Sequence, residues 1–195
     1  MKKTLRLWMC ATILLLCGTS LVGCKEKAAE ATVEESQVEE QTYLTAVNDY
    51  LVNEIGRYYS PGDVCIPCPT VVSVDEGNPD DVLVWGDFWV FNYQIAGDTL
   101  KTVSGGDHPG LMHVQKTDSG FVVKSFDAVV NGAGNMESAK RIFGDHYDDY
   151  HAFNSDQKKR EEARALFISH FVKENKLPVT MYQDYGWPAV TLPNI

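Results

Sequence analysis

The segment Phe88-Trp89-Val90-Phe91-Asn92-Tyr93-Gln94-Ile95 carries the strongest structural signal in this chain. Its aromatic and apolar residues at 89, 91, 93 and 95 fall on one face of an extended chain, because successive side chains of a strand point to opposite faces. Asn92 and Gln94 fall on the other face. This period of two predicts a half-buried β-strand.

Further strands are expected on both sides of this segment. Residues 70–74 are β-branched and residues 82–85 are apolar, with the turn Glu76-Gly77-Asn78-Pro79 between them. After the turn Gly97-Asp98, residues 99–103 continue as a strand. Residues 111–116 and 121–130 predict a hairpin around Asp118-Ser119-Gly120, and the glycine-rich residues 104–110 predict a loop or bulge that bends the sheet.

Helical periodicity appears before and after these strands. Apolar residues recur every three or four positions over 42–58, and Ser60-Pro61-Gly62 ends that helix. Residues 136–143 predict a short helix, and residues 156–176 predict a long one with Ser155 as its N-cap. The apolar face expected on the long helix consists of Ala163, Leu166, Phe167, His170 and Phe171.

Together these elements predict an α+β domain in which the helices cover one sheet face. An N-terminal helix packs on a curved antiparallel sheet of about four to five strands, and further helices follow at the C-terminal end. This order resembles the cystatin-like and NTF2-like folds. Three segments also resemble stretches of uncharacterised gut-bacterial lipoproteins, namely residues 81–93, Ser104-Gly105-Gly106 and residues 138–144. The resemblance spans roughly residues 42–150 and implies a fold and a location, but no activity.

The N-terminus predicts export and lipidation. Lys2, Lys3 and Arg6 precede an apolar run that is too short for a membrane span, and small residues follow it. Leu21-Val22-Gly23-Cys24 matches the lipobox of bacterial lipoprotein precursors. We therefore expect residues 1–23 to be a signal peptide and Cys24 to carry the acyl chains, palmitate among them, that hold the protein on a bilayer.

A tether is expected between this anchor and the folded domain. Residues 25–40 contain six glutamates and two lysines, and few apolar residues that could form a core. The expected organisation is thus residues 1–23 as signal peptide, residues 24–40 as lipidated cysteine and acidic tether, and residues 41–195 as a single domain. Lys25 is not the aspartate that retains lipoproteins in the inner membrane, so a Gram-negative host would place the protein in the outer membrane.

Charge restricts the partners of the mature chain. The sequence has 17 basic and 27 acidic residues, and residues 1–23 hold three of the basic ones, so 14 basic and 27 acidic residues leave a net charge of −13. Such a surface repels nucleic acid. The expected partners are the bilayer, reached through the acyl anchor, and a small ligand or an envelope protein; no cofactor is implied.

Cys65 and Cys68 form a Cys-Ile-Pro-Cys motif. A candidate disulfide between them suits an oxidising compartment, and a structural or incidental role is favoured. A redox-active pair is the alternative, although Pro69 and a β-branched run follow where a helix would be needed. A zinc site would need two more ligands, and the sequence contains no second pair.

Three other regions carry candidate chemistry. Residues 144–151 gather two histidines and three aspartates, which suit a solvated surface better than a cation site or a His-Asp pair. The aromatic tail 182–188 either folds back on the sheet or forms a contact patch. If the curved sheet encloses a cavity, the candidate pocket residues are Asp87, Asn92, Tyr93 and His113.

The sequence contains no local nucleophile elbow and no metalloprotease motif. The favoured hypothesis is therefore an envelope-anchored domain that binds a ligand or protein through its concave sheet face or its aromatic tail. One alternative is an NTF2-like enzyme that uses His113, Asp87 or Tyr93 as an acid-base group. The other is a thiol-redox protein that uses Cys65 and Cys68.

Overall fold

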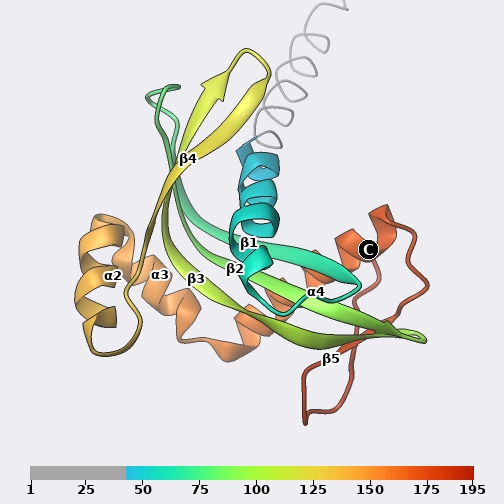
Figure 1. Ribbon diagram of the computed structural model, residues 1–195. Coiled ribbons are helices and arrows are strands. Elements are labelled where there is room, and N and C mark those ends of the chain that lie inside the picture. Colours follow the sequence, from blue (N-terminus) through green and yellow to red (C-terminus); the bar gives the residue numbers. More distant parts are fainter. Residues whose placement is uncertain (1–42) are drawn as a thin grey trace, which may run out of the picture. The chain divides into compact units, whose positions relative to one another are not determined.

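The computed structural model describes residues 43–195, which form an α+β arrangement with a curved, open sheet (Figure 1). The first helix covers residues 43–50 and continues through η1 (Leu51–Ile55) and η2 (Gly56–Tyr58); residues 43–58 are called the N-terminal helix below. The strands are β1 (Val64–Asp75), β2 (Val82–Ala96), β3 (Thr99–Thr117), β4 (Gly120–Ala128), β5 (Met181–Gln183) and β6 (Val190–Thr191). The later helices are η3 (Gly132–Gly134), α2 (Asn135–Phe143), η4 (Gly144–His146), α3 (Tyr147–Asn154) and α4 (Gln157–Glu174).

The strands form one mixed sheet. Their order is β1-β2-β3-β5-β6, and β4 pairs with another part of β3. All of these pairs are antiparallel except β3 with β5, which run parallel. The expectation of a purely antiparallel sheet is therefore wrong at β5, which pairs with β3 only after the chain has passed through η3, α2, η4, α3 and α4.

Irregular pairing explains why the sheet is curved. The three long antiparallel ladders each contain one register shift, between Val71 and Ser73 in β1, between Asn92 and Tyr93 in β2, and between His113 and Val114 in β3. An extra residue in one strand of a pair bends and twists the sheet locally. Three such shifts in neighbouring ladders bend the sheet around the N-terminal helix.

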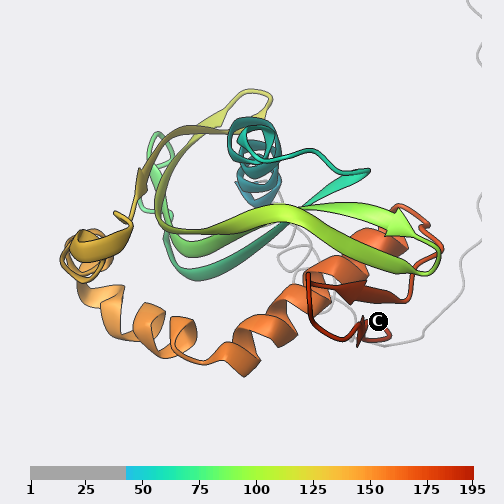
Figure 2. The same cartoon turned by 60° about the horizontal axis from the view of Figure 1, so that its bottom comes forward.

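Helices cover both faces of the sheet, as the turned view in Figure 2 shows. The even-numbered residues Val84, Phe88 and Val90 of β2 pack in one core with Val47 and Leu51 of the N-terminal helix. On the opposite face, odd-numbered residues of β2 pack in two further clusters with α2, α3 and α4. The expectations of a half-buried central strand and of helices on one face only are both wrong, because the C-terminal helices cover the side that would have faced solvent.

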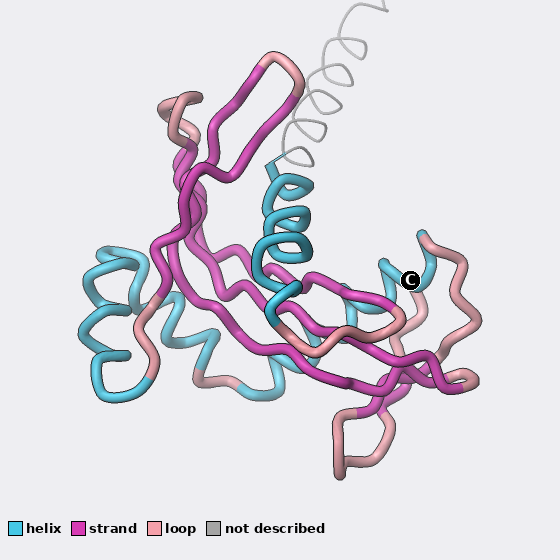
Figure 3. Tube along the Cα trace, in the orientation of Figure 1, coloured by secondary structure: helices cyan, strands magenta, loops and turns pink. Residues whose placement is uncertain are grey.

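Two segments that lie outside the strands expected from the sequence belong to strands in the structure. Residues 104–110 lie within β3, which runs unbroken from Thr99 to Thr117 (Figure 3). The Cys65–Cys68 motif lies within β1, which begins at Val64. Glycine and proline lower strand propensity, but pairing with β2 along the whole length of both segments overrides that local preference.

The long helix α4 begins and packs differently from the sequence-based expectation. Its N-cap is Asp156 rather than Ser155, and the Asp156 side chain accepts a hydrogen bond from the backbone N–H of Lys159. Its buried residues are Arg164, Ala165, Ile168 and Ser169, whereas Leu166 and His170 of the expected face are exposed. The apolar pattern of the sequence did not predict this buried face, because the charged Arg164 is part of it.

Within residues 43–195, every helix is too short or too polar to span a bilayer. The predicted signal peptide, the lipidation site Cys24 and the tether lie outside the described residues.

Gly105 and Gly97 provide a matched test of the strand assignment, because both have positive φ, at 146° and 65°. A Cβ on Gly105 would collide with the carbonyl oxygen of Val90, whereas a Cβ on Gly97 would meet no atom within 4 Å. We expect Gly105→Ala to lower the free energy of unfolding by more than about 3 kcal/mol and Gly97→Ala by about 1 kcal/mol. Denaturant titration of both variants measures this, and equal losses would contradict the close approach of β2 and β3 at Gly105.

Candidate functional site

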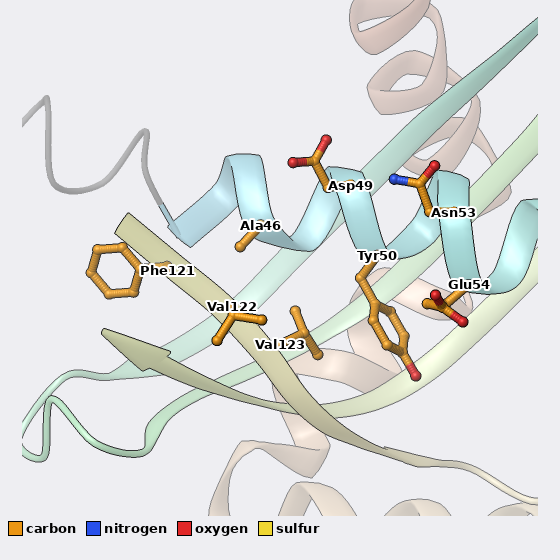
Figure 4. A pocket seen from close by; sticks show the side chains of 8 residues that line it. All are labelled: Ala46, Asp49, Tyr50, Asn53, Glu54, Phe121, Val122 and Val123. Carbon is orange, nitrogen blue, oxygen red and sulfur yellow. The ribbon is translucent and has the colours of Figure 1, made fainter. Parts of the chain in front are cut away.

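A groove of about 440 Å³ lies between the N-terminal helix and β4, on the concave side of the sheet (Figure 4). The helix contributes one wall and the strand contributes the other. Helical spacing brings residues 46, 49, 50, 53 and 54 to the same flank of the helix. The lining residues are Ala46, Asp49, Tyr50, Asn53, Glu54, Phe121, Val122 and Val123.

The inner part of the groove is apolar. The Tyr50 ring points from the helix toward β4 (Figure 4) and contacts Phe126 edge to face, with ring centroids 6.3 Å apart. Phe121 and Val123 are partly buried and pack against the same core as Tyr50. Burial, reinforced by the charge of Glu54, raises the pKa of Tyr50, so its hydroxyl stays protonated and can donate a hydrogen bond. The floor therefore offers aromatic surface with one polar end.

The rim of the groove is acidic. Asp49 is exposed and makes no ion pair with any described residue. Glu54 pairs with Arg57 at 3.3 Å, but both side chains are about half exposed, and such surface pairs are weak. This rim favours a cationic ligand over an anionic one.

Strand β4 can also contribute backbone N–H and C=O groups to the groove. Among the described strands β4 pairs only with β3, so its other edge carries N–H and C=O groups without strand partners. An edge of this kind accepts an added strand from another chain. The sequence pattern did not predict this site. Its acidic residues lie on the flank of the N-terminal helix, whereas the periodicity that predicts the helix describes only its apolar face.

The four residues of the expected pocket do not converge. Asn92 lies on the face of the N-terminal helix, where its side-chain amide donates to the carbonyl oxygen of Gly56 at 3.3 Å. Tyr93 and Asp87 lie on the opposite face of β2, as the alternation of the strand requires. His113 pairs with Asp81, the two atoms Nδ1 and Oδ1 lying 2.8 Å apart. The concave face at β2 is filled by the core under the N-terminal helix.

Tyr93 belongs to a buried network centred on Arg164. The Arg164 guanidinium donates to the Tyr93 hydroxyl from Nε and Nη2, at 3.0 and 2.8 Å, and binds both carboxylate oxygens of Asp184 at 2.8 Å. It also donates to Thr102 and lies 3.7 Å from the centroid of the Phe91 ring. Each guanidinium nitrogen is occupied, so this arginine fixes α4 and the segment after β5 to the sheet rather than binding a ligand. Burial raises the pKa of Tyr93, which remains neutral.

Asp87 lies on the same face of β2 as Tyr93, but its side chain lacks hydrogen-bond partners among the described residues. It is fully buried, and neither carboxylate oxygen makes a hydrogen bond within the described residues. Burial raises its pKa to about 6; the nearby Trp89 indole N–H opposes the shift without reaching hydrogen-bond geometry, and the charge of Asp107 reinforces it. A carboxylate in this position costs stability when it ionises.

Cys65 and Cys68 are both free thiols, so the candidate disulfide is not formed in the structure. They lie three residues apart in β1, which places their side chains on opposite faces: Cys65 packs against the core of the N-terminal helix and Cys68 against the core of α4. Burial raises the pKa of the Cys68 thiol to about 12. This arrangement disfavours a redox-active pair, which needs an accessible thiolate.

The remaining candidates serve packing. His146 stacks against Trp85 with ring centroids 4.6 Å apart, and His151 lies against Tyr147. No cluster of three or more His, Cys, Asp or Glu side chains that could hold a metal ion occurs in residues 43–195. In the aromatic tail Tyr182 is buried, whereas Tyr185 and Trp187 are exposed, so the tail both folds back and leaves an aromatic surface.

The described domain thus presents an acidic, partly apolar groove on one sheet face and a buried polar layer on the other. Comparisons of the chain with protein-family models, with curated proteins and with solved structures found no match.

Replacing Asp87 with asparagine tests the charge burial on β2. The pKa of Asp87 in the folded protein, about 6, lies above the ordinary value of 3.8. The contribution of this group to the unfolding free energy of the wild type is therefore most favourable below pH 4, where Asp87 is protonated in both states. This stability is lost as the pH rises through 6, by up to about 3 kcal/mol. We expect Asp87→Asn to gain stability over the wild type between pH 4 and pH 7, measured as the difference between their unfolding free energies. A constant difference across that range would contradict the buried carboxylate.

Proposed function

We propose that this protein is a lipid-anchored binding protein of the bacterial cell envelope. The basic start, the short apolar run and the lipobox ending at Cys24 support the anchor. Lys25 supports the outer membrane as its location in a Gram-negative host. The acidic residues 25–40 then serve as a tether that holds the domain away from the bilayer surface.

The ligand proposed for the groove is an extended, basic peptide segment of an envelope protein. The observation that carries this proposal is the juxtaposition of two features: an edge of β4 that pairs with no other strand among residues 43–195, and an acidic rim on the N-terminal helix. Added as a strand beside β4, the peptide would gain main-chain hydrogen bonds, and its side chains would point alternately in opposite directions. Apolar side chains would contact Tyr50 and Val123, and basic ones would meet Asp49 and Glu54.

A cystatin-like or NTF2-like origin is part of the proposal. A helix packed inside a curved sheet, followed by a β-meander, supports this reading. The resemblance to gut-bacterial lipoproteins supports it as well. Both readings concern fold and location, and the binding function rests on the groove alone.

Charge reversal at the rim tests the ligand class. We expect Asp49→Lys to weaken binding of a peptide of alternating lysine and valine by about tenfold at low salt, because a favourable charge pair becomes repulsive. Glu174→Lys at the C-terminal end of α4 changes the net charge equally but lies on the other face, so it should leave the affinity unchanged. Fluorescence anisotropy of the labelled peptide measures both. Equal loss in the two variants would show non-specific attraction and would contradict the groove.

Replacing Cys24 tests the anchor. We expect Cys24→Ser to abolish metabolic labelling with radioactive palmitate and to release the protein from the membrane fraction, because the thiol that carries the lipid is gone. Cys17→Ser, seven residues earlier in the same segment, should label and fractionate as the wild type does. Labelling that survives in Cys24→Ser would contradict lipidation at this residue.

A further inference from the structure

A second pocket lies where the C-terminal end of α4 meets the segment 177–195, which runs back beside that helix (Figure 2). Its volume is about 700 Å³, which is within the range of small-ligand sites. Three parts of the chain line it: the last turns of α4, residues 177–180 that lead into β5, and residues 191–195. We call it the C-terminal pocket. It shares no lining residue with the groove at β4.

The interior of the C-terminal pocket is aliphatic. Val179 is buried, and Val172, Leu177 and Leu192 are partly buried and pack against the same core under α4. None of the described residues that line the pocket is aromatic. Planar rings and bases gain affinity by stacking on aromatic side chains. A surface of Val and Leu side chains instead suits a flexible hydrocarbon chain, which gains by burial alone.

The rim of the C-terminal pocket is basic, although the whole sequence has 27 acidic and only 17 basic residues. The described lining contains two lysines and no acidic side chain. Lys173 donates from Nζ to the carbonyl oxygen of Ile195 at 2.9 Å, so it is already engaged across the pocket. Lys176 is exposed and forms no ion pair with any described residue. A free ammonium group beside an aliphatic pocket favours a ligand with one anionic end.

The backbone at Lys176 is strained. Its φ is 53°, and it is the one non-glycine residue with positive φ among residues 43–195. It follows the C-cap of α4, where the Leu177 N–H donates to the Val172 carbonyl at 2.9 Å and the Lys176 N–H donates to the Lys173 carbonyl at 3.2 Å. Glycine usually occupies this position of a helix end, because a side chain there is costly. Strain of this kind is typical of functional positions, and here it holds an unpaired ammonium group at the pocket.

We propose that the C-terminal pocket binds a fatty acid. The carboxylate lies beside the Lys176 ammonium group, and the hydrocarbon chain packs on Val172, Val179 and Leu192. One free lysine balances one negative charge, so the site favours a monoanionic amphiphile over a phosphate-rich ligand. The basic peptide proposed for the groove has the opposite charge, so the two ligands do not compete.

Photolabelling tests this proposal on the purified full chain. The probe is dodecanoate that carries a photoreactive diazirine on its chain, used at micromolar concentration. Trypsin cleaves after lysine and arginine, so residues 177–195 are recovered as one peptide. We expect saturable labelling of this peptide, quantified by mass spectrometry.

Two unlabelled competitors separate the carboxylate from the chain. Dodecanol has the same chain without the charge, and it should compete at least about fivefold more weakly than dodecanoate, because it forms no ion pair with Lys176. Butyrate has the same carboxylate with eight fewer methylene groups, and it should compete at least about a hundredfold more weakly.

Variants at Lys176 separate binding from folding. Lys176→Gln should weaken labelling by at least about fivefold, whereas Lys176→Arg keeps the charge and should retain it. Lys176→Gly should lose labelling as well, without a lower melting temperature, because glycine adopts positive φ without strain. Lys158→Gln, at the far end of α4, removes the same charge and should label as the wild type does.

Four results would overturn the proposal. They are labelling that is spread along the chain or fails to saturate, competition by dodecanol equal to that by dodecanoate, competition by butyrate equal to that by dodecanoate, and wild-type labelling of Lys176→Gln. Peptide binding in the groove is measured independently, so each of these results leaves that proposal standing.

Discussion

Strand β2 faces protein on both sides over most of its length, and this burial determines where the other layers lie. Its even-numbered residues pack under the N-terminal helix, and its odd-numbered residues pack against α2, α3 and α4. A slip of one residue would exchange the two sets, because side chains alternate along a strand. Each misplaced Val or Phe would forfeit about 1.5–3 kcal/mol of burial free energy. The register of β2 is therefore strongly specified, and the groove and the buried network of Arg164 lie on opposite faces as a result.

Two charged groups, Arg164 and Asp87, are buried on the side of the sheet that the odd-numbered residues of β2 face. They differ in how well they are paired. Arg164 is buried with a bidentate carboxylate partner and further acceptors, so it holds α4 and the segment after β5 in place. Asp87 has no such partner within the described residues, so its ionisation destabilises the folded state. Fully matched groups of this kind serve the architecture, whereas unmatched groups in a buried layer are typical of functional positions.

Local pattern and long-range pairing explain which parts of this fold could be read from the sequence. The N-terminal helix and its end near Tyr59, the hairpin at Asp118 and the two-residue period of β2 depend on neighbouring residues, and the structure confirms them. Residues 104–110 and the Cys65–Cys68 segment lay outside the expected strands because glycine and proline lower strand propensity, yet both pair with β2 in the structure. The apolar pattern of α4 did not predict its buried face, because the charged Arg164 is one of the buried residues. The groove joins a helix flank to a strand about seventy residues away, and no local pattern encodes that contact.

The groove between the N-terminal helix and β4 is the centre of this account, and hydrogen exchange along the strand edges tests it directly. Amide exchange would be followed residue by residue while the peptide of alternating lysine and valine is added. Strand addition predicts that the outward-facing amides of β4 become protected, because they donate to the added strand, while the free edge of β1 exchanges as before. Protection confined to β1, or no new protection at saturating peptide, would contradict the groove as the binding site.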